Sequence, residues 1–265
     1  MLTIAGLIAM AGSLRAQNTT NQPPLPKIDE VLKQIAARST QEDDEHAFKL
    51  AYSYHRMKVK EVRNGSGELK KREVKTGEHV PKPKTDDADP DDDIEQTEPE
   101  GHSITNLVRS GRGKAFDRSD FALTDELLNR FKFTLVGREK LQDRPVLVID
   151  FHPRGGNLPE NGIKDKFINK AAGRVWVDEE DYALVKADLY LTKRVNVFGG
   201  LIGAVWEFTF QCLRERTEEG YWFVRNSGWH LEGRQVFLTR IIDYTEEKTD
   251  VKRYTPTEQA KVTTR

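Results

Sequence analysis

The chain has 265 residues, a formal net charge of −1 and 32% charged residues. This length fits one large all-β domain or two small ones, and either can bury a hydrophobic core. Because positive and negative charges nearly balance, the composition excludes the strongly basic field of proteins that bind nucleic acid or anionic membranes.

The first residues, MLTIAGLIAMAGSLRAQ, predict a secretory signal peptide over residues 1–16. The apolar run 2–12 is too short to span a bilayer, and Ala16 supplies the small residue that cleavage before Gln17 requires. No Lys or Arg precedes the run, so a buried N-terminal helix or a residual anchor is the alternative. The single cysteine, Cys212, allows no intrachain disulfide and lies too far along the chain to carry a lipid. We therefore expect a soluble periplasmic protein of the bacterial envelope.

A Pro-rich linker over 17–27 precedes a predicted amphipathic helix over 28–38. Ile28, Val31, Leu32 and Ile35 recur at helical spacing in this segment. Strands are expected near 48–63 and 67–78, joined by a loop of sequence NGSG. The insert at about 80–105 is rich in Pro and acids, which predicts disorder; its DADPDDDIE run suggests calcium binding, but lacks the ligand spacing of an EF-hand.

The second half predicts a largely antiparallel meander. A short helix near 124–129, with Thr124 as its N-cap, leads into strands near 131–140 and 145–152. A helical piece near 163–172 precedes a hairpin over 174–191 and long strands near 203–216, 221–232 and 235–247. Short connectors favour antiparallel pairing. We expect one domain over 28–254, followed by a polar tail over 255–265.

The predicted fold class is mainly β (α+β): a strongly curved antiparallel sheet or incomplete β-barrel with short helices covering its concave face. Alternation along the late strands places many apolar residues on one face, where they form either an ordinary core or a ligand cavity. The cavity candidates are Val185, Leu189, Leu191, Trp206, Phe208, Phe210, Tyr221, Phe223 and Trp229.

Catalytic and metal-binding patterns are weak in this sequence. Ser227 and His230 lie in a strand pattern without an evident oxyanion donor, so we expect no catalysis. His55, His79, His102, His152 and His230 have no paired ligand spacing, which predicts neither a metal site nor a cofactor. The four acids 178–181 fall in a turn, where solvation is the expected role.

Two motifs resemble the LolA/LolB/RseB-like outer-membrane lipoprotein-sorting superfamily: GREKLQDRP at 137–145, and GRVWVDEEDY at 173–182. The resemblance covers about 28–254 without the acidic insert. It implies a curved sheet whose helices cover acyl chains or other apolar ligands, with helix 28–38 as a lid. Two function classes stay open: a periplasmic carrier of lipid acyl chains or lipoproteins, and an RseB-like sensor module that engages another envelope protein through a sheet edge or rim.

Overall fold

The computed structural model describes residues 23–41, 44–81, 125–156, 158–160, 162–197, 203–235 and 237–255. The expected signal peptide, almost all of the acidic insert and all but the first residue of the polar tail lie outside these residues. None of the helices in the described ranges combines the length and the apolar character needed to cross a membrane.

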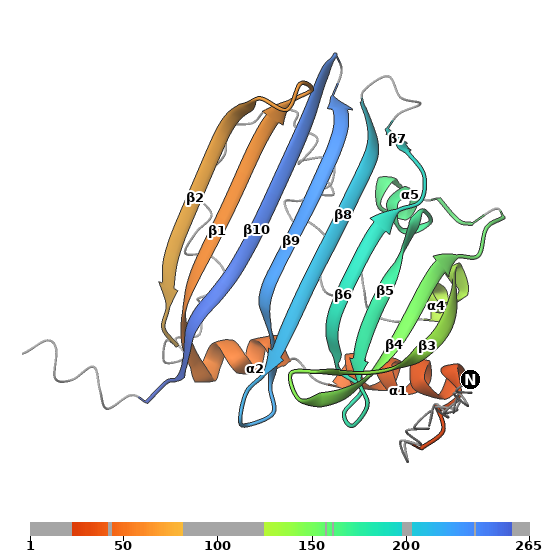
Figure 1. The fold of residues 1–265 in the computed structure, drawn as a ribbon, viewed down its shortest axis with the longest axis vertical. Coiled ribbons are helices and arrows are strands. Elements are labelled where there is room, and N and C mark those ends of the chain that lie inside the picture. Colours follow the sequence, from red (N-terminus) through yellow and green to blue (C-terminus); the bar gives the residue numbers. More distant parts are fainter. Residues whose placement is uncertain are drawn as a thin grey trace, which may run out of the picture.

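Ten strands form one open antiparallel sheet in the order β2-β1-β10-β9-β8-β6-β5-β4-β3, with short β7 paired to β8 (Figure 1). The expected mainly β fold is confirmed, but the sheet is not closed into a barrel, because β2 and β3 remain its two edges. The strands are β1 Tyr52–Asn64, β2 Leu69–His79, β3 Phe131–Leu141, β4 Arg144–Pro153, β5 Ala171–Asp178, β6 Leu184–Leu191, β7 Val195–Val197, β8 Gly203–Arg216, β9 Trp222–Gln235 and β10 Leu238–Arg253.

The predicted meander is confirmed from β3 to β10, where each long strand pairs with the next one in the chain. Hairpin β1–β2 breaks this sequence order, because β1 pairs with the last strand, β10, over almost its whole length. Val59 thus lies opposite Thr245. The first and the last long strands of the chain, β1 and β10, are therefore neighbours inside the sheet.

Four described helices accompany the sheet: α1 Ile28–Gln41, α2 Asp44–Ala51, α4 Asp125–Arg130 and α5 Ile163–Ile168. Helix α2 corrects the prediction that a strand begins near residue 48. Its apolar residues also fit a strand pattern, but Asp44 and Glu45 in its first turn and Lys49 in its last turn complement the helix dipole. Helix geometry therefore prevails until Tyr52.

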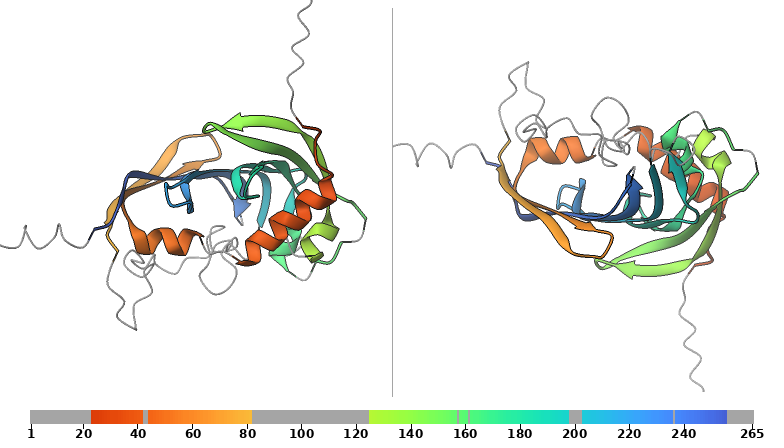
Figure 2. Two further views of the ribbon diagram at one scale, coloured as in Figure 1. Left: turned by 90° about the horizontal axis from the view of Figure 1, so that it is seen from below. Right: turned by 90° about the horizontal axis from the view of Figure 1, so that it is seen from above.

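Helices α1, α2 and α5 pack on one face of the sheet, which we call the helix face. Figure 2 shows α1 and α2 on the same side of the strands. Val31 of α1 packs with Leu147, Ile149 and Val177, and Phe167 of α5 packs with Val205 and Leu231. Phe48 of α2 is fully buried and its ring centre lies 4.2 Å from that of Phe223. A buried apolar side chain from each of these three helices thus packs against the sheet.

The opposite face, which we call the outer face, has a core of its own at one end of the sheet. Strand β4 alternates Leu147 and Ile149, which face α1, with Val146 and Val148, and all four are buried. Val146 and Val148 pack with Trp176, Ala183, Val185 and Trp222. Strand β4 is therefore buried on both faces.

Candidate functional site

The two motifs that carry the family resemblance bind each other. Arg144 Nε lies 2.5 Å from Asp178 Oδ2, and its NH2 group lies 2.8 Å from Oδ1. Arg138 pairs in the same two-pronged way with Glu179. Two bidentate pairs therefore lock the β3–β4 hairpin to the β5–β6 turn.

Asp178 is fully buried, so the expectation that the turn acids are solvated is wrong for this residue. It also accepts hydrogen bonds from the backbone N–H groups of Glu180 and Asp181. Burial alone would raise the pKa of Asp178, but the bonds from Arg144 and these amides outweigh it, and the pKa lies below its usual value. These contacts give the motif a structural role.

The helix face carries a transverse series of four apolar side chains on adjacent strands. Leu189 of β6 is opposite Phe210 of β8, which is opposite Trp229 of β9, which is opposite Tyr244 of β10. The Trp229 and Tyr244 rings stack at 5.6 Å. We call Leu189, Phe210, Trp229 and Tyr244 the apolar row. Three of its members were predicted cavity residues.

All four side chains of the row are partly buried. Cys212 follows Phe210 on the same face, and burial raises the pKa of its thiol to about 11. Burial, together with the nearby charge of Glu246, also raises the pKa of the Tyr244 hydroxyl. The thiol and the hydroxyl therefore favour their neutral forms, while Glu246 accepts a hydrogen bond from the Tyr244 hydroxyl at 2.8 Å.

Four other predicted cavity residues pack against helices. Leu191 and Phe208, together with Trp229 of the apolar row, pack in the cluster of Phe167 from α5. Tyr221 and Phe223 pack in the cluster of Phe48 from α2. These residues form two helix-docking clusters on either side of the apolar row.

Val185 and Trp206 are not where simple alternation places them. An irregularity in the β5–β6 register follows Trp176, and Val185 packs with Trp176 and Trp222 in the outer-face core. A second irregularity lies between Val205 and Glu207, so Val205 takes the core position beside Phe208. Trp206 instead is half-buried, with the Arg194 guanidinium 5.8 Å from its ring centre. Each β-bulge shifts the side chains that follow it.

The predicted lid residues belong to α1, which packs on β4 and β5. Val31 is buried there, Ile28 and Ile35 pack around it, and Leu32 is half-buried. Polar contacts also hold α2, because Lys248 donates to Glu45 at 2.7 Å and to the Val224 carbonyl at 3.1 Å. The lid role of 28–38 stays a prediction.

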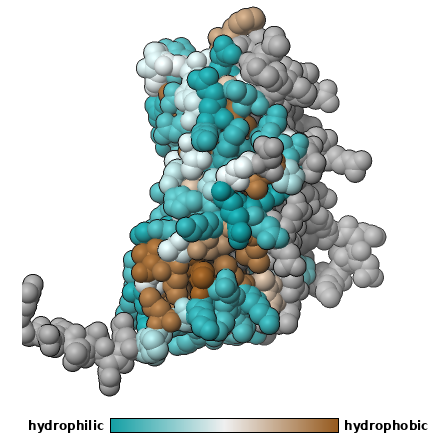
Figure 3. All heavy atoms as spheres, turned by 90° about the vertical axis from the view of Figure 1, so that its right-hand side faces the viewer, coloured by the Kyte–Doolittle hydropathy of each residue, from teal (hydrophilic) through white to brown (hydrophobic). Residues whose placement is uncertain are grey.

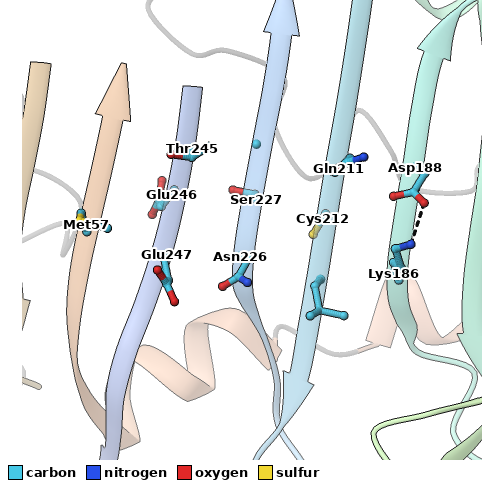
Figure 4. Close-up of a pocket in the computed structure, with 12 residues that line it drawn as sticks. Met57, Lys186, Asp188, Gln211, Cys212, Asn226, Ser227, Thr245, Glu246 and Glu247 are labelled. Carbon is cyan, nitrogen blue, oxygen red and sulfur yellow. Dashed lines mark ion pairs between the residues drawn. The ribbon is translucent and has the colours of Figure 1, made fainter. Parts of the chain in front are cut away.

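A hollow of about 390 Å³ opens on the outer face across β1, β10, β9, β8 and β6 (Figure 4). Charged and amide side chains dominate its wall, including Lys186, Asp188, Gln211, Asn226 and Glu247. Lys186 pairs with Asp188 at 2.8 Å. None of the nine predicted cavity residues lines this hollow.

Ser227 and His230 lie three residues apart in β9 and therefore on opposite faces. Ser227 is opposite Cys212 on the helix face, whereas His230 pairs with Asp243 on the outer face. These two side chains cannot act as a nucleophile and its base.

A scan against protein-family models finds no match, and neither does a search of curated proteins. Solved structures give distant matches. A protein domain from Vibrio parahaemolyticus, described there as outer membrane lipoprotein-sorting, is 13% identical with a TM-score of 0.35, over 88% of this chain and 95% of that one. A LolA superfamily protein from Nitrosomonas europaea is 7% identical with a TM-score of 0.24, over 89% and 97%.

The MucA/MucB complex from Pseudomonas aeruginosa is also similar, at 8% identity and a TM-score of 0.24, over 85% of this chain and 98% of that one. All of these matches have low sequence identities and low TM-scores. They are distant, so the residues of this chain must carry any functional conclusion.

Proposed function

We propose that the protein is a non-catalytic binding protein of the bacterial periplasm that holds the acyl chains of a lipid or lipoprotein against its helix face. The apolar row of Leu189, Phe210, Trp229 and Tyr244 carries this proposal. Strands are about 4.8 Å apart, so four adjacent side chains form a strip of roughly 14 Å across the sheet. Such a strip suits a chain of methylene groups.

The chemistry around the row favours an uncharged ligand segment. Burial raises the pKa of both the Cys212 thiol and the Tyr244 hydroxyl, so an ion placed between them would lose its hydration. An acyl chain has no charge to desolvate, and each buried methylene contributes about 0.8 kcal/mol. The row therefore favours ligands with a long apolar chain.

Under this proposal, movement of one helix on the helix face lets the ligand reach the row. Helix α1 has 14 residues and α2 has 8, and each docks in its own cluster, around Val31 and Phe48. Under this proposal α1 moves, because α2 is also held by the buried Lys248–Glu45 pair. Movement of α1 would also have to break the bonds from Arg38 of α1 to Asp44 of α2, at 3.0 Å, and to the Asp181 carbonyl, at 3.1 Å.

Binding of saturated fatty acids of increasing length to the purified protein tests the proposal. At about 0.8 kcal/mol per methylene, each added group tightens binding roughly fourfold. Phe210→Asp should abolish binding by placing a carboxylate in the row. Gln211→Asp is the matched control, because Gln211 is the next residue of β8 and faces the outer side.

Circular dichroism and native mass spectrometry complete this experiment by showing that both variants fold and which of them retains lipid. Affinity that does not depend on chain length would refute the acyl site. Equal loss in Phe210→Asp and Gln211→Asp would also count against it.

A second function, binding of an envelope protein, is favoured by the contrast between the two edges of the sheet. Edge strand β2 carries a dense series of charged residues from Lys70 to Lys75. Such charges oppose pairing with another strand. Edge β3 begins FKFTLVG, and its Val136 is 49% exposed. Figure 3 shows apolar side chains gathered on the lower part of the side that carries β3.

A photo-crosslinking residue at Val136 tests this second function in intact cells. Val74 on edge β2 is the matched control, since it is 52% exposed and also lies in an edge strand. We expect one discrete crosslinked envelope protein from position 136 and none from position 74. The same product from both positions would rule out specific pairing at β3.

A further inference from the structure

Three metal-ligating side chains meet on the outer face of β8 and β9. They are Glu207, His230 and Glu232, whose ligand atoms all lie within 4.8 Å of one another. Glu207 is directly opposite Glu232 across the two strands, and His230 precedes Glu232 by two residues, which puts both on one face. One ion can therefore contact all three side chains.

The hydrogen bond of His230 prepares its ring for a metal. Its Nδ1 atom lies 2.7 Å from Asp243 Oδ1 of β10. An ionised carboxylate can only accept a hydrogen bond, so Nδ1 is the donor and Nε2 is the nitrogen left to bind a metal. Histidine ligands of metals are typically held by a carboxylate in this way.

The two glutamates repel each other in the absence of a cation. Like charges directly opposite each other on neighbouring strands destabilise a sheet. Within the described residues, no Lys or Arg forms an ion pair with Glu207 or Glu232, whereas Asp243 has Arg63 at 3.8 Å. A divalent ion between the glutamates would remove this repulsion.

We propose that Glu207, His230 and Glu232 bind one divalent transition-metal ion, with zinc as the best fit, and that Asp243 positions His230. Imidazole nitrogen with two carboxylates suits Zn²⁺, whereas Ca²⁺ and Mg²⁺ prefer oxygen ligands alone. Glu207 is exposed, so water or a ligand can complete the coordination. The site is on the face opposite the apolar row and is independent of acyl binding.

The sequence contains one local sign of this site, the pattern His230-Leu231-Glu232. In a strand, this spacing puts the imidazole and the carboxylate on one face. The third ligand, Glu207, precedes His230 by 23 residues. The three ligands can therefore be recognised as one site only when the β8–β9 register is known.

Titration of the metal-free, full-length protein with ZnCl₂ in competition with a chromophoric chelator tests the proposal. The wild type should bind one zinc per chain, and His230→Ala or Glu207→Gln should weaken binding at least tenfold. Asp243→Asn should weaken it roughly 10–100-fold with all three ligands in place. His55→Ala is the control and should bind as the wild type does.

The control is well matched because His55 is also a surface histidine between two acids, with Asp250 at 3.2 Å and Glu78 at 3.8 Å. An equal loss in His55→Ala and His230→Ala, unchanged binding in Glu207→Gln, or no zinc binding by the wild type would each overturn the proposal. Tighter binding of Ca²⁺ than of Zn²⁺ would overturn the metal assignment.

Thermal unfolding gives a second readout that a merely structural role would not produce. In EDTA, Glu207→Gln should melt at or above the wild-type temperature, because one of the two opposed charges is gone. Zinc should raise the melting temperature of the wild type but not that of Glu207→Gln. Destabilisation of Glu207→Gln in EDTA would contradict the repulsion on which the site depends.

Discussion

Replacing Asp178 with Asn should destabilise the protein by about 3 kcal/mol. The fully buried carboxylate accepts two bonds from Arg144 and two from backbone amides. An Asn side chain would turn its NH₂ group toward the Arg144 guanidinium or toward the amides, so donor would face donor. Removing one member of a buried ion pair costs about 3–5 kcal/mol, and Arg144 retains Glu180 at 2.9 Å, which favours the lower end.

Equilibrium unfolding in urea, followed by tryptophan fluorescence, measures this loss. Trp176 and Trp222 lie in the core beside the turn and report on it directly. With a slope of about 3 kcal/mol per molar urea, the midpoint should fall by roughly 1 M at an unchanged slope. The circular dichroism spectrum of the folded variant should stay that of a β protein.

Glu180→Gln is the matched control for this measurement, because Glu180 contacts the same arginine but its side chain is 63% exposed. Surface pairs of this kind contribute roughly 0–1 kcal/mol. A loss below about 1 kcal/mol in Asp178→Asn, or equal losses in the two variants, would refute the conclusion that the two motifs stabilise the fold through the buried pair.

Three further predictions concern acid stability, the thiol and α2. Because the folded-state pKa of Asp178 is lowered, its stabilisation is present above its ordinary pKa of about 3.9 and is lost as the pH falls below it; urea unfolding from pH 6 to pH 3 should therefore show a steeper loss for the wild type than for Asp178→Asn. Cys212, with its pKa raised to about 11, should react with iodoacetamide at pH 8 far more slowly in the native protein than in urea, and equal rates would show that the thiol is accessible. Phe48→Ala should lower the free energy of unfolding by about 3–5 kcal/mol, whereas Leu50→Ala, at a side chain 41% exposed, should change it by less than about 0.5 kcal/mol; similar losses would mean that α2 is not docked through Phe48.

Most of the sheet could be predicted from the sequence because its signals are local. Alternation in β3 to β10 and short connectors between most of them identify the strands and their antiparallel order. The start of β1 was misplaced, because the apolar residues near Phe48 fit a helix and a strand equally well. The acidic first turn and basic last turn of α2 favour the helix, and the contact between Phe48 and Phe223 docks it on the sheet.

The candidate sites were less predictable because they depend on register. Strict alternation assigns Val185 and Trp206 to the helix face, but an irregularity in each strand pairing changes their environment. No local sequence pattern marks a bulge there. Likewise, Arg144 and Asp178 are 34 residues apart, and nothing in either motif alone indicates that one neutralises the other.

The pairing of β1 with β10 has a consequence for how the chain reaches its native state. His55 lies opposite Thr249, so contacts of the longest sequence separation join the first hairpin to the rest of the sheet. Loop closure over such a distance is slow, and in an emerging chain the edge of β1 that is not paired with β2 has no partner until the last strand has been made. Until β10 is made, this edge of β1 is an additional unpaired strand edge that another chain could pair with.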